Sequence, residues 1–142
     1  MRALLDINVL IALHDREHIH HERAALWLEA NISHGWASCP LTQNGCLRIM
    51  SQPGYSSSQS LAVLIAMLQG STGTAFHALW SDDISLLDSH YFHHLHIHSH
   101  NQLTDLYLLA LAVKNDGRLV SFDQRIPLSA VQGARVEHLV KL

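Results

Sequence analysis

The first thirteen residues join two apolar segments through a single acidic residue. Residues 3–5 (Ala-Leu-Leu) form a continuous apolar run, which is typical of a strand buried on both faces in a parallel sheet. Asp6 ends this run, Asn8 is suited to cap a helix, and residues 9–13 supply an apolar helix surface. Ligands of parallel α/β folds bind at the carboxyl ends of strands, so Asp6 lies where chemistry is expected. The alternative is that Asp6 only caps the helix, together with Asn8.

The rest of the chain alternates predicted strands and helices, which favours an α/β fold with a mostly parallel sheet and helices on both faces. No internal repeat or change of composition divides the chain, so we expect a single domain over residues 1–142. Apolar runs and helical spacing place the elements along the chain. Strands are predicted at 36–39, 84–88, 118–122 and 136–140, and helices at 22–32, 42–50, 61–68, 74–80 and 101–115.

Composition narrows the classes of function. The chain is 48% hydrophobic, which excludes a disordered or fibrous protein. No apolar run is long enough to cross a bilayer and no signal-peptide pattern is present, so we expect a cytoplasmic protein with no membrane partner. Cys39 and Cys46 are expected to be buried free thiols. The net charge of −3 lacks the basic balance of many nucleic-acid binders, so an RNA partner would need metal ions or a local basic patch.

Three aspartates are placed where they can meet. Asp6 and Asp123 each follow a predicted buried strand, and the carboxyl ends of central parallel strands share one edge of the sheet. Asp105 lies in the first turn of the longest predicted helix, where the helix dipole favours a negative charge. Taken singly, Asp6 is explained as a helix cap, Asp105 as a first-turn acid and Asp123 as a turn residue. Together, three partly buried carboxylates must raise their pKa values or hold a cation, and all-oxygen ligands indicate Mg²⁺ or Mn²⁺.

The histidines offer a different interpretation. His94, His96, His98 and His100 alternate, and in a strand they would share one face on which Zn²⁺ or Ni²⁺ could bind. No cysteine or carboxylate completes a recognisable zinc pattern beside them. We therefore favour a polar surface segment that happens to use histidine.

Four blocks together resemble the PIN-domain family, and more narrowly the VapC-type ribonuclease toxins of bacterial toxin–antitoxin pairs. They are L-L-D-x-N-x-L-I-A-L, C-P-L-T-x-N-G-x-L-R-I-M, L-T-D-L-Y-L-L-A-L-A and L-V-S-F-D-x-R-I, and they extend from Met1 to about Ile126. The resemblance implies a PIN-like α/β/α sandwich that cuts RNA with Mg²⁺ or Mn²⁺ held by four acids. It also implies a homodimer, and a cognate antitoxin whose C-terminal segment crosses the acidic groove. The matching site positions are Asp6, Asp105 and Asp123 as first, third and fourth acids, with Asn8 and Ser121 as supporting polar residues.

Gln43 stands where the resemblance implies the second acid, a glutamate. Because its amide is neutral, the site keeps three carboxylates and a second metal ion should bind less well, which weakens activity. Gln43 is either natural, giving a weakened or repurposed scaffold that binds RNA or a protein without cleaving, or an engineered change that makes a toxic nuclease safe to express. The basic residues that could contact RNA phosphates are Arg48, Lys114, Arg118 and Arg125.

Overall fold

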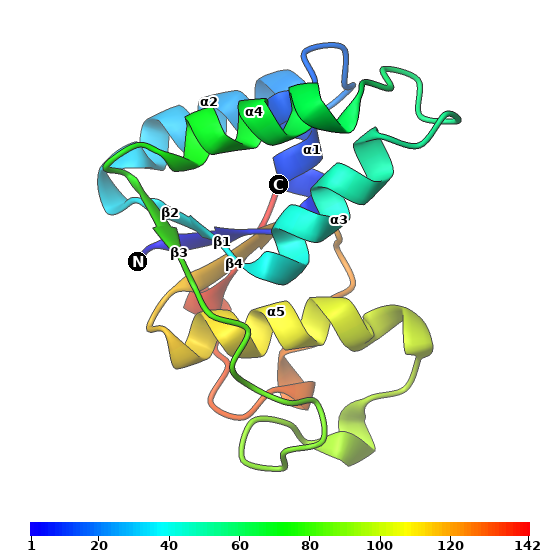
Figure 1. The fold of residues 1–142 in the computed structure, drawn as a ribbon. Coiled ribbons are helices and arrows are strands. Elements are labelled where there is room, and N and C mark those ends of the chain that lie inside the picture. Colours follow the sequence, from blue (N-terminus) through cyan, green and yellow to red (C-terminus); the bar gives the residue numbers. More distant parts are fainter.

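Five short strands form one parallel sheet at the centre of the molecule (Figure 1). The computed structural model describes all residues from Met1 to Leu142. The strand order is β3-β2-β1-β4-β5, and all four pairings are parallel, which confirms the predicted fold class. The central position of β1 brings the residue that follows it to the middle of the carboxyl edge of the sheet. The strands are β1 (Ala3–Leu5), β2 (Trp36–Ser38), β3 (His77–Leu79), β4 (Arg118–Ser121) and β5 (Leu139–Lys141).

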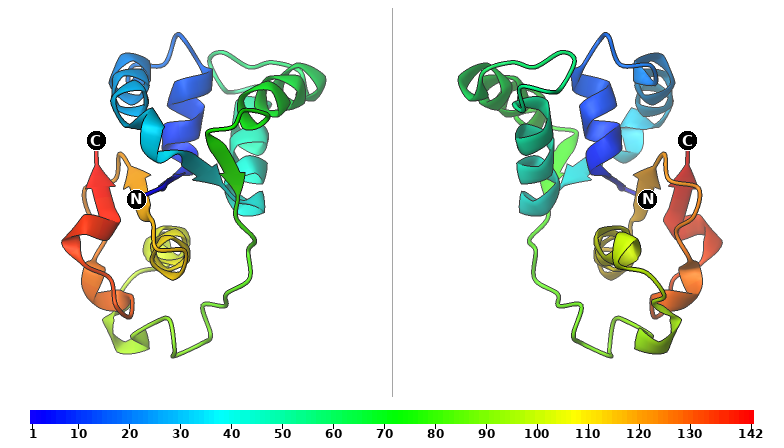
Figure 2. Two further views of the ribbon diagram at one scale, coloured as in Figure 1. Left: turned by 90° about the vertical axis from the view of Figure 1, so that its left-hand side faces the viewer. Right: turned by 90° about the vertical axis from the view of Figure 1, so that its right-hand side faces the viewer.

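The helices divide unequally between the two faces of the sheet. Helices α1 to α4 cover one face of the sheet and the long helix α5 covers the other (Figures 1 and 2). This three-layer arrangement is the predicted α/β/α sandwich. None of the helices combines the length and the apolarity that a membrane span requires. The helices are α1 (Ile7–His14), α2 (His21–Asn31), α3 (Pro40–Met50), α4 (Leu61–Thr72) and α5 (Leu103–Lys114).

The apolar run of β1 supplies two separate cores. Ala3 and Leu5 point to the face covered by α1–α4, where they pack with Trp36 and Val120. Leu4, between them, points to the opposite face and joins the core around α5. A strand that is covered on both faces has no solvent side, and this explains why it reads as a continuous apolar run rather than as an alternation.

α5 is buried around nearly its whole circumference. All seven residues from Leu106 to Ala112 are buried, because the helix packs on the sheet on one side and is covered by chain segments on the other. Phe92 and residues 126–131 belong to this cover. The first turn of α5 is therefore fixed in position by the core that follows it.

Two predicted elements are wrong. Residues 74–80 do not form a helix, because residues 77–79 pair with β2 as the edge strand of the sheet. Residues 84–88 do not form a strand: they make turns, and Ile84 and Leu86 pack on the core around α5. Cys39 and Cys46 are buried free thiols as predicted, and burial raises the pKa of each to about 11.

Candidate active site

Asp6 lies at the carboxyl end of the central strand and forms the N-cap of α1. One carboxylate oxygen, Oδ1, accepts a hydrogen bond from the Ile7 N–H at 2.7 Å, and the other, Oδ2, accepts one from Oγ of Ser121 at 2.6 Å. The side chain is nearly inaccessible to water, at 4% exposure. The prediction that Asn8 is the N-cap is wrong, because the acid that directly follows the strand takes that position and Asn8 lies within the first turn.

Ser121 links the ends of the two central strands. Its hydroxyl donates to Asp6, accepts from the Asp123 N–H at 3.0 Å, and accepts from Nδ2 of Asn8 at 3.3 Å. Asn8 in turn accepts a hydrogen bond from the Phe122 N–H at 3.4 Å. Because Ser121 is completely buried, this network fixes the orientation of Asp6 relative to β4. Of the two residues predicted to support the acids, Ser121 thus contacts Asp6 and the backbone of Asp123, and Asn8 contacts Ser121.

Three carboxylates converge at this edge of the sheet. Burial, the charges of Asp6 and Asp123, and a hydrogen bond with Asp123 together raise the pKa of Asp105 to about 7. Burial and the charge of Asp123 also raise the pKa of Asp6, against the opposing effect of its hydrogen bonds from Ser121 and Ile7. Asp123 is oriented by the Arg125 N–H, which donates to its Oδ1 at 2.8 Å. The repulsion that the sequence predicted among these acids is therefore present.

The donor set fits a hard divalent cation. Asp6, Asp105 and Asp123 offer only oxygen ligands, and Mg²⁺ and Mn²⁺ prefer such ligands. A cation between these side chains would offset the burial and the repulsion that raise the pKa values of Asp6 and Asp105. No group of three or more His, Cys, Asp or Glu side chains lies close enough together in this structure to hold a metal ion. The fit thus rests on donor chemistry and electrostatic coupling rather than on a finished coordination shell.

The raised pKa of Asp105 makes the stability of the metal-free protein depend on pH. Because its folded pKa of about 7 exceeds the ordinary 3.8, protonation favours the folded state, and stability should fall as pH rises from about 4 to about 7. We expect the melting temperature in chelator to drop by several degrees between pH 5 and pH 8, as measured by circular dichroism. In Asp105→Asn the decline should be clearly smaller, because the raised pKa of Asp6 remains while the lowered pKa values of His14 and His77 act in the opposite direction. A decline as steep as in the wild type would contradict the assignment.

Two hollows border the carboxylates, and each is lined in part by a residue from the first turn of α5. The first, of about 420 Å³, is lined by Asp105 and Asp123, and the second, of about 600 Å³, by Ile7 and Thr104. Ile7 directly follows Asp6 and Thr104 directly precedes Asp105, so the second hollow also borders the cluster. The other residues of the first hollow are Ser99, Asn101, Gln102, Arg125, Ile126 and Pro127, and those of the second are Pro40, Leu41, Asn44, Gly45, Arg48 and Asp82.

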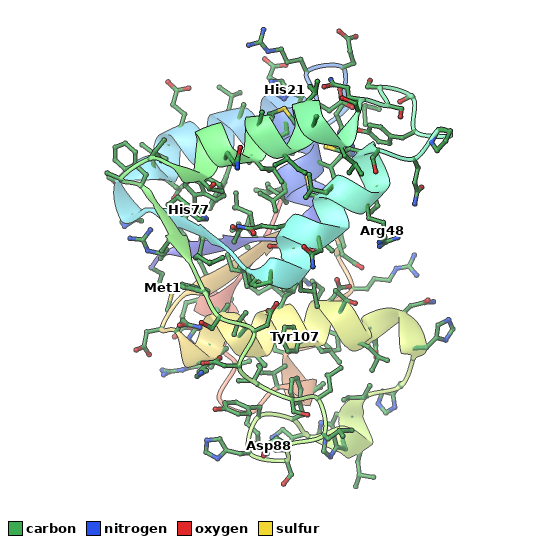
Figure 3. The ribbon with its side chains drawn as sticks, viewed as in Figure 1. Met1, His21, Arg48, His77, Asp88 and Tyr107 are labelled. Atoms are coloured by element: carbon green, nitrogen blue, oxygen red, sulfur yellow. The ribbon has the colours of Figure 1, made fainter.

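Of the four basic residues considered for RNA contacts, two lie at these hollows. Arg125 lines the first hollow and Arg48 the second, and Figure 3 shows Arg48 projecting outward from α3. Lys114, at the far end of α5, forms an ion pair with Asp83 at 2.5 Å. The fourth residue, Arg118, lies over the Trp27 ring and donates a hydrogen bond to Oδ1 of Asn31. Lys114 and Arg118 therefore make structural contacts elsewhere in the fold and do not line the hollows.

Asp82 is a site residue that the sequence did not reveal. Its Oδ2 accepts a hydrogen bond from the Leu41 N–H at 2.8 Å, and its Oδ1 accepts one from the Tyr107 hydroxyl at 3.0 Å. Asp82 thus joins the start of α3 to α5 and fixes the width of the second hollow. No local pattern signals this role, because its partners are distant in the sequence. Asn101 and Gln102 line the first hollow, and their position as a polar pair directly before the Asp105 helix is the sequence feature that could have indicated them.

Gln43 makes no hydrogen bond to any of the three carboxylates. Its Nε2 donates instead to Oγ of Ser38 on β2 at 2.9 Å. The face of α3 that borders the second hollow carries Asn44, Gly45 and Arg48. A Cβ at Gly45 would lie 2.5 Å from the Ile7 side chain, so the missing side chain allows α3 to approach α1 beside the acids.

The histidine-rich segment does not form a strand. Residues 94–96 and 100–102 are single 3₁₀ turns, so the alternating histidines do not share one face. His94 and His96 instead contact the backbone carbonyls of Leu86 and Ser129. These contacts assign the segment a role in covering the α5 side of the fold.

Comparison with known proteins gives consistent results. The sequence profile of the PIN-domain family matches residues 3–132. A Mycobacterium tuberculosis protein named ribonuclease VapC44 is 54% identical over 142 residues, which is 100% of both chains. Another protein of that organism, ribonuclease VapC39, is 40% identical over 134 residues, which is 94% of this chain and 96% of the relative.

Two solved structures share the fold at low sequence identity. VapBC2 of Rickettsia felis, bound to a DNA fragment from its promoter, aligns with a TM-score of 0.58 at 16% identity, covering 89% of this chain and 94% of that one. VapC20 of Mycobacterium tuberculosis, a toxin that cleaves the sarcin–ricin loop, aligns with a TM-score of 0.59 at 11% identity, covering 87% and 91%.

Proposed function

Because this chain belongs to the PIN-domain family, and within it to the VapC ribonucleases, we propose that it is a metal-dependent endoribonuclease toxin of a type II toxin–antitoxin pair. The observation that carries the proposal is the convergence of Asp6, Asp105 and Asp123 from three separate elements, with the pKa of Asp105 raised to about 7. A cluster of mutually repelling acids costs stability, and a functional cation explains why such a cluster is kept.

In the proposed mechanism the three aspartates would hold the divalent ion. When bound, the ion supplies charge that stabilises the negative charge developing on the scissile phosphate. Ser121 holds Asp6 in one orientation through its 2.6 Å hydrogen bond, and Asn8 holds Ser121. The low exposure of Asp6 excludes water from its oxygens and strengthens its attraction to a cation. These residues therefore preorganise the donors before substrate arrives.

The two hollows suggest the path of the RNA. A single strand that passes over the acids would place one neighbouring nucleotide in each hollow, with Arg125 on one side and Arg48 on the other. Each guanidinium can pair with a phosphate oxygen on its side of the scissile bond. This local arrangement compensates for the net charge of −3 and for the acids themselves.

The proposal includes two protein partners, a second copy of this chain and a cognate antitoxin. The structural neighbour VapBC2 supports an antitoxin, because it was solved as a VapBC assembly. α4 carries no charged residue and leaves Leu61, Val63 and Ile65 at least 42% exposed, which is consistent with a protein contact. We propose that the protein acts in the cytoplasm, where its RNA substrate is found.

The test is RNA cleavage by the purified chain with and without metal. We expect Mn²⁺ or Mg²⁺ at millimolar concentration to raise cleavage of a panel of structured and unstructured RNAs at least about 100-fold over EDTA. Denaturing gels would show discrete internal cuts. The competing proposal is a scaffold that binds RNA without cleaving it. Metal-independent RNA retention in filter binding, with intact RNA in every metal, would favour that scaffold and reject the nuclease.

A further inference from the structure

A chain of side-chain hydrogen bonds joins α3 to the edge of the sheet, outside the carboxylate cluster. Nε2 of Gln43 donates to Oγ of Ser38, and this oxygen lies 2.8 Å from Nε2 of His77 on β3. Ser38 is 1% exposed, so the centre of this chain is dry. Figure 3 shows His77 and Arg48 at opposite sides of the view.

The direction of these hydrogen bonds is determined by their chemistry. An amide nitrogen can only donate, so the Ser38 oxygen accepts from Gln43. The buried Ser38 hydroxyl has no acceptor within hydrogen-bond distance other than Nε2 of His77, so its proton is directed to that nitrogen, which must then be unprotonated. A reversed amide would instead accept the Ser38 proton and would require a proton on Nε2 of His77. Burial and the positive charge of Arg2 lower the pKa of His77, which disfavours a charged ring at this place.

We propose that Gln43 is a positioning residue, whose amide proton holds α3 against the β2–β3 edge through Ser38 and a neutral His77, and that it is not a ligand of the active-site ion. The second part of this inference rests on the proposed function, and the first part does not. The proposal explains why a glutamine is suited to this position: a carboxylate has no proton to give to Ser38. It also leaves the ion with the three aspartates as its only carboxylate ligands.

Gln43→Glu tests the proposal directly. The new carboxylate would accept from Ser38, so Nε2 of His77 would have to donate to Ser38, and a negative charge would lie one hydrogen bond away from the ring. We therefore expect NMR titration of the metal-free protein to show the pKa of His77 raised by at least about one unit, a tenfold change in proton affinity. In the double variant Ser38→Ala, Gln43→Glu, this increase should be largely lost, because Ser38 transmits it. The number of Mn²⁺ ions bound per chain should not change.

Asn44→Asp is the matched control, because it adds the same charge one residue further along α3, on the face that lines the second hollow. It should strengthen Mn²⁺ binding and leave His77 unaffected. An extra Mn²⁺ in Gln43→Glu together with an unchanged His77 titration would overturn the proposal. The wild type provides an independent test if the variant does not fold: ¹⁵N shifts should show His77 with its proton on Nδ1, and a proton on Nε2 rejects the hydrogen-bond chain. Loss of the nuclease proposal would not affect these measurements on metal-free protein.

Discussion

Asp6→Asn is expected to lower the rate of RNA cleavage by about 10³-fold or more while leaving the fold intact. The substitution removes the charge that would hold the cation, but it keeps the shape of the side chain. Asparagine is as good an N-cap as aspartate, and its carbonyl can still accept the hydrogen bond from Ile7 or from Ser121. The loss should therefore appear in single-turnover rates with Mn²⁺, with a melting temperature that is equal to or higher than that of the wild type, because one repelling charge is removed.

Asp88→Asn is the control for this prediction. Asp88 is an exposed acid that accepts a hydrogen bond from the His90 N–H in a turn far along the chain from the site, so its cleavage rate should stay within twofold of the wild type. A fully active Asp6→Asn protein would remove Asp6 from the site. Equal loss of cleavage in both variants would instead indicate a general effect of surface charge on RNA binding.

Leu109→Ala is expected to lower the free energy of unfolding by about 3–4 kcal/mol. Leu109 is completely buried in the middle of α5, and α5 is the only helix that covers its face of the sheet. Neighbouring side chains cannot move in to fill the cavity left by the truncation, because α5 is tightly packed on both sides. Urea denaturation followed by circular dichroism measures the change. At 37 °C this variant should also lose cleavage, since Asp105 is held by the same helix.

Leu103→Ala, at the start of the same helix, is the matched control. Leu103 is 40% exposed, so the same truncation should cost below about 1 kcal/mol. A small loss for Leu109→Ala, comparable to that of Leu103→Ala, would show that the α5 face is less tightly packed than the structure describes.

The sequence predicted well those features that depend on local patterns. The apolar residues of segments 3–5 and 118–122 identified the two central strands, because burial on both faces leaves few polar positions, of which Ser121 is one. The acids that end them were expected to meet, since parallel strands end at one edge. Residues 74–80 were mispredicted because an edge strand with apolar residues such as Phe76 and Leu79 has no clear period, and pairing with β2 decided its structure.

Other features depended on contacts between distant residues. Nothing near Asp82 in the sequence shows that it joins α3 to α5, and nothing near Arg118 shows that it lies over Trp27 rather than beside the groove. The position of Gln43 was inferred from a resemblance, which gives the place of a residue along α3 but not the direction of its side chain. Rotation around a helix axis separates neighbours by about 100°, so Gln43 and Asn44 face different surroundings.

The hydrogen bonds that join Asp6, Ser121 and the backbone of Asp123 also restrict how this protein can change in length. An insertion within β4 would turn the serine hydroxyl to the opposite face of the sheet and bring an aliphatic side chain to the aspartate. Insertions and deletions should therefore accumulate in the irregular segment between β3 and α5, where turns contribute cover but no donors to this network. Homologous chains of different length would then differ in that segment, while the serine stays two positions before the aspartate.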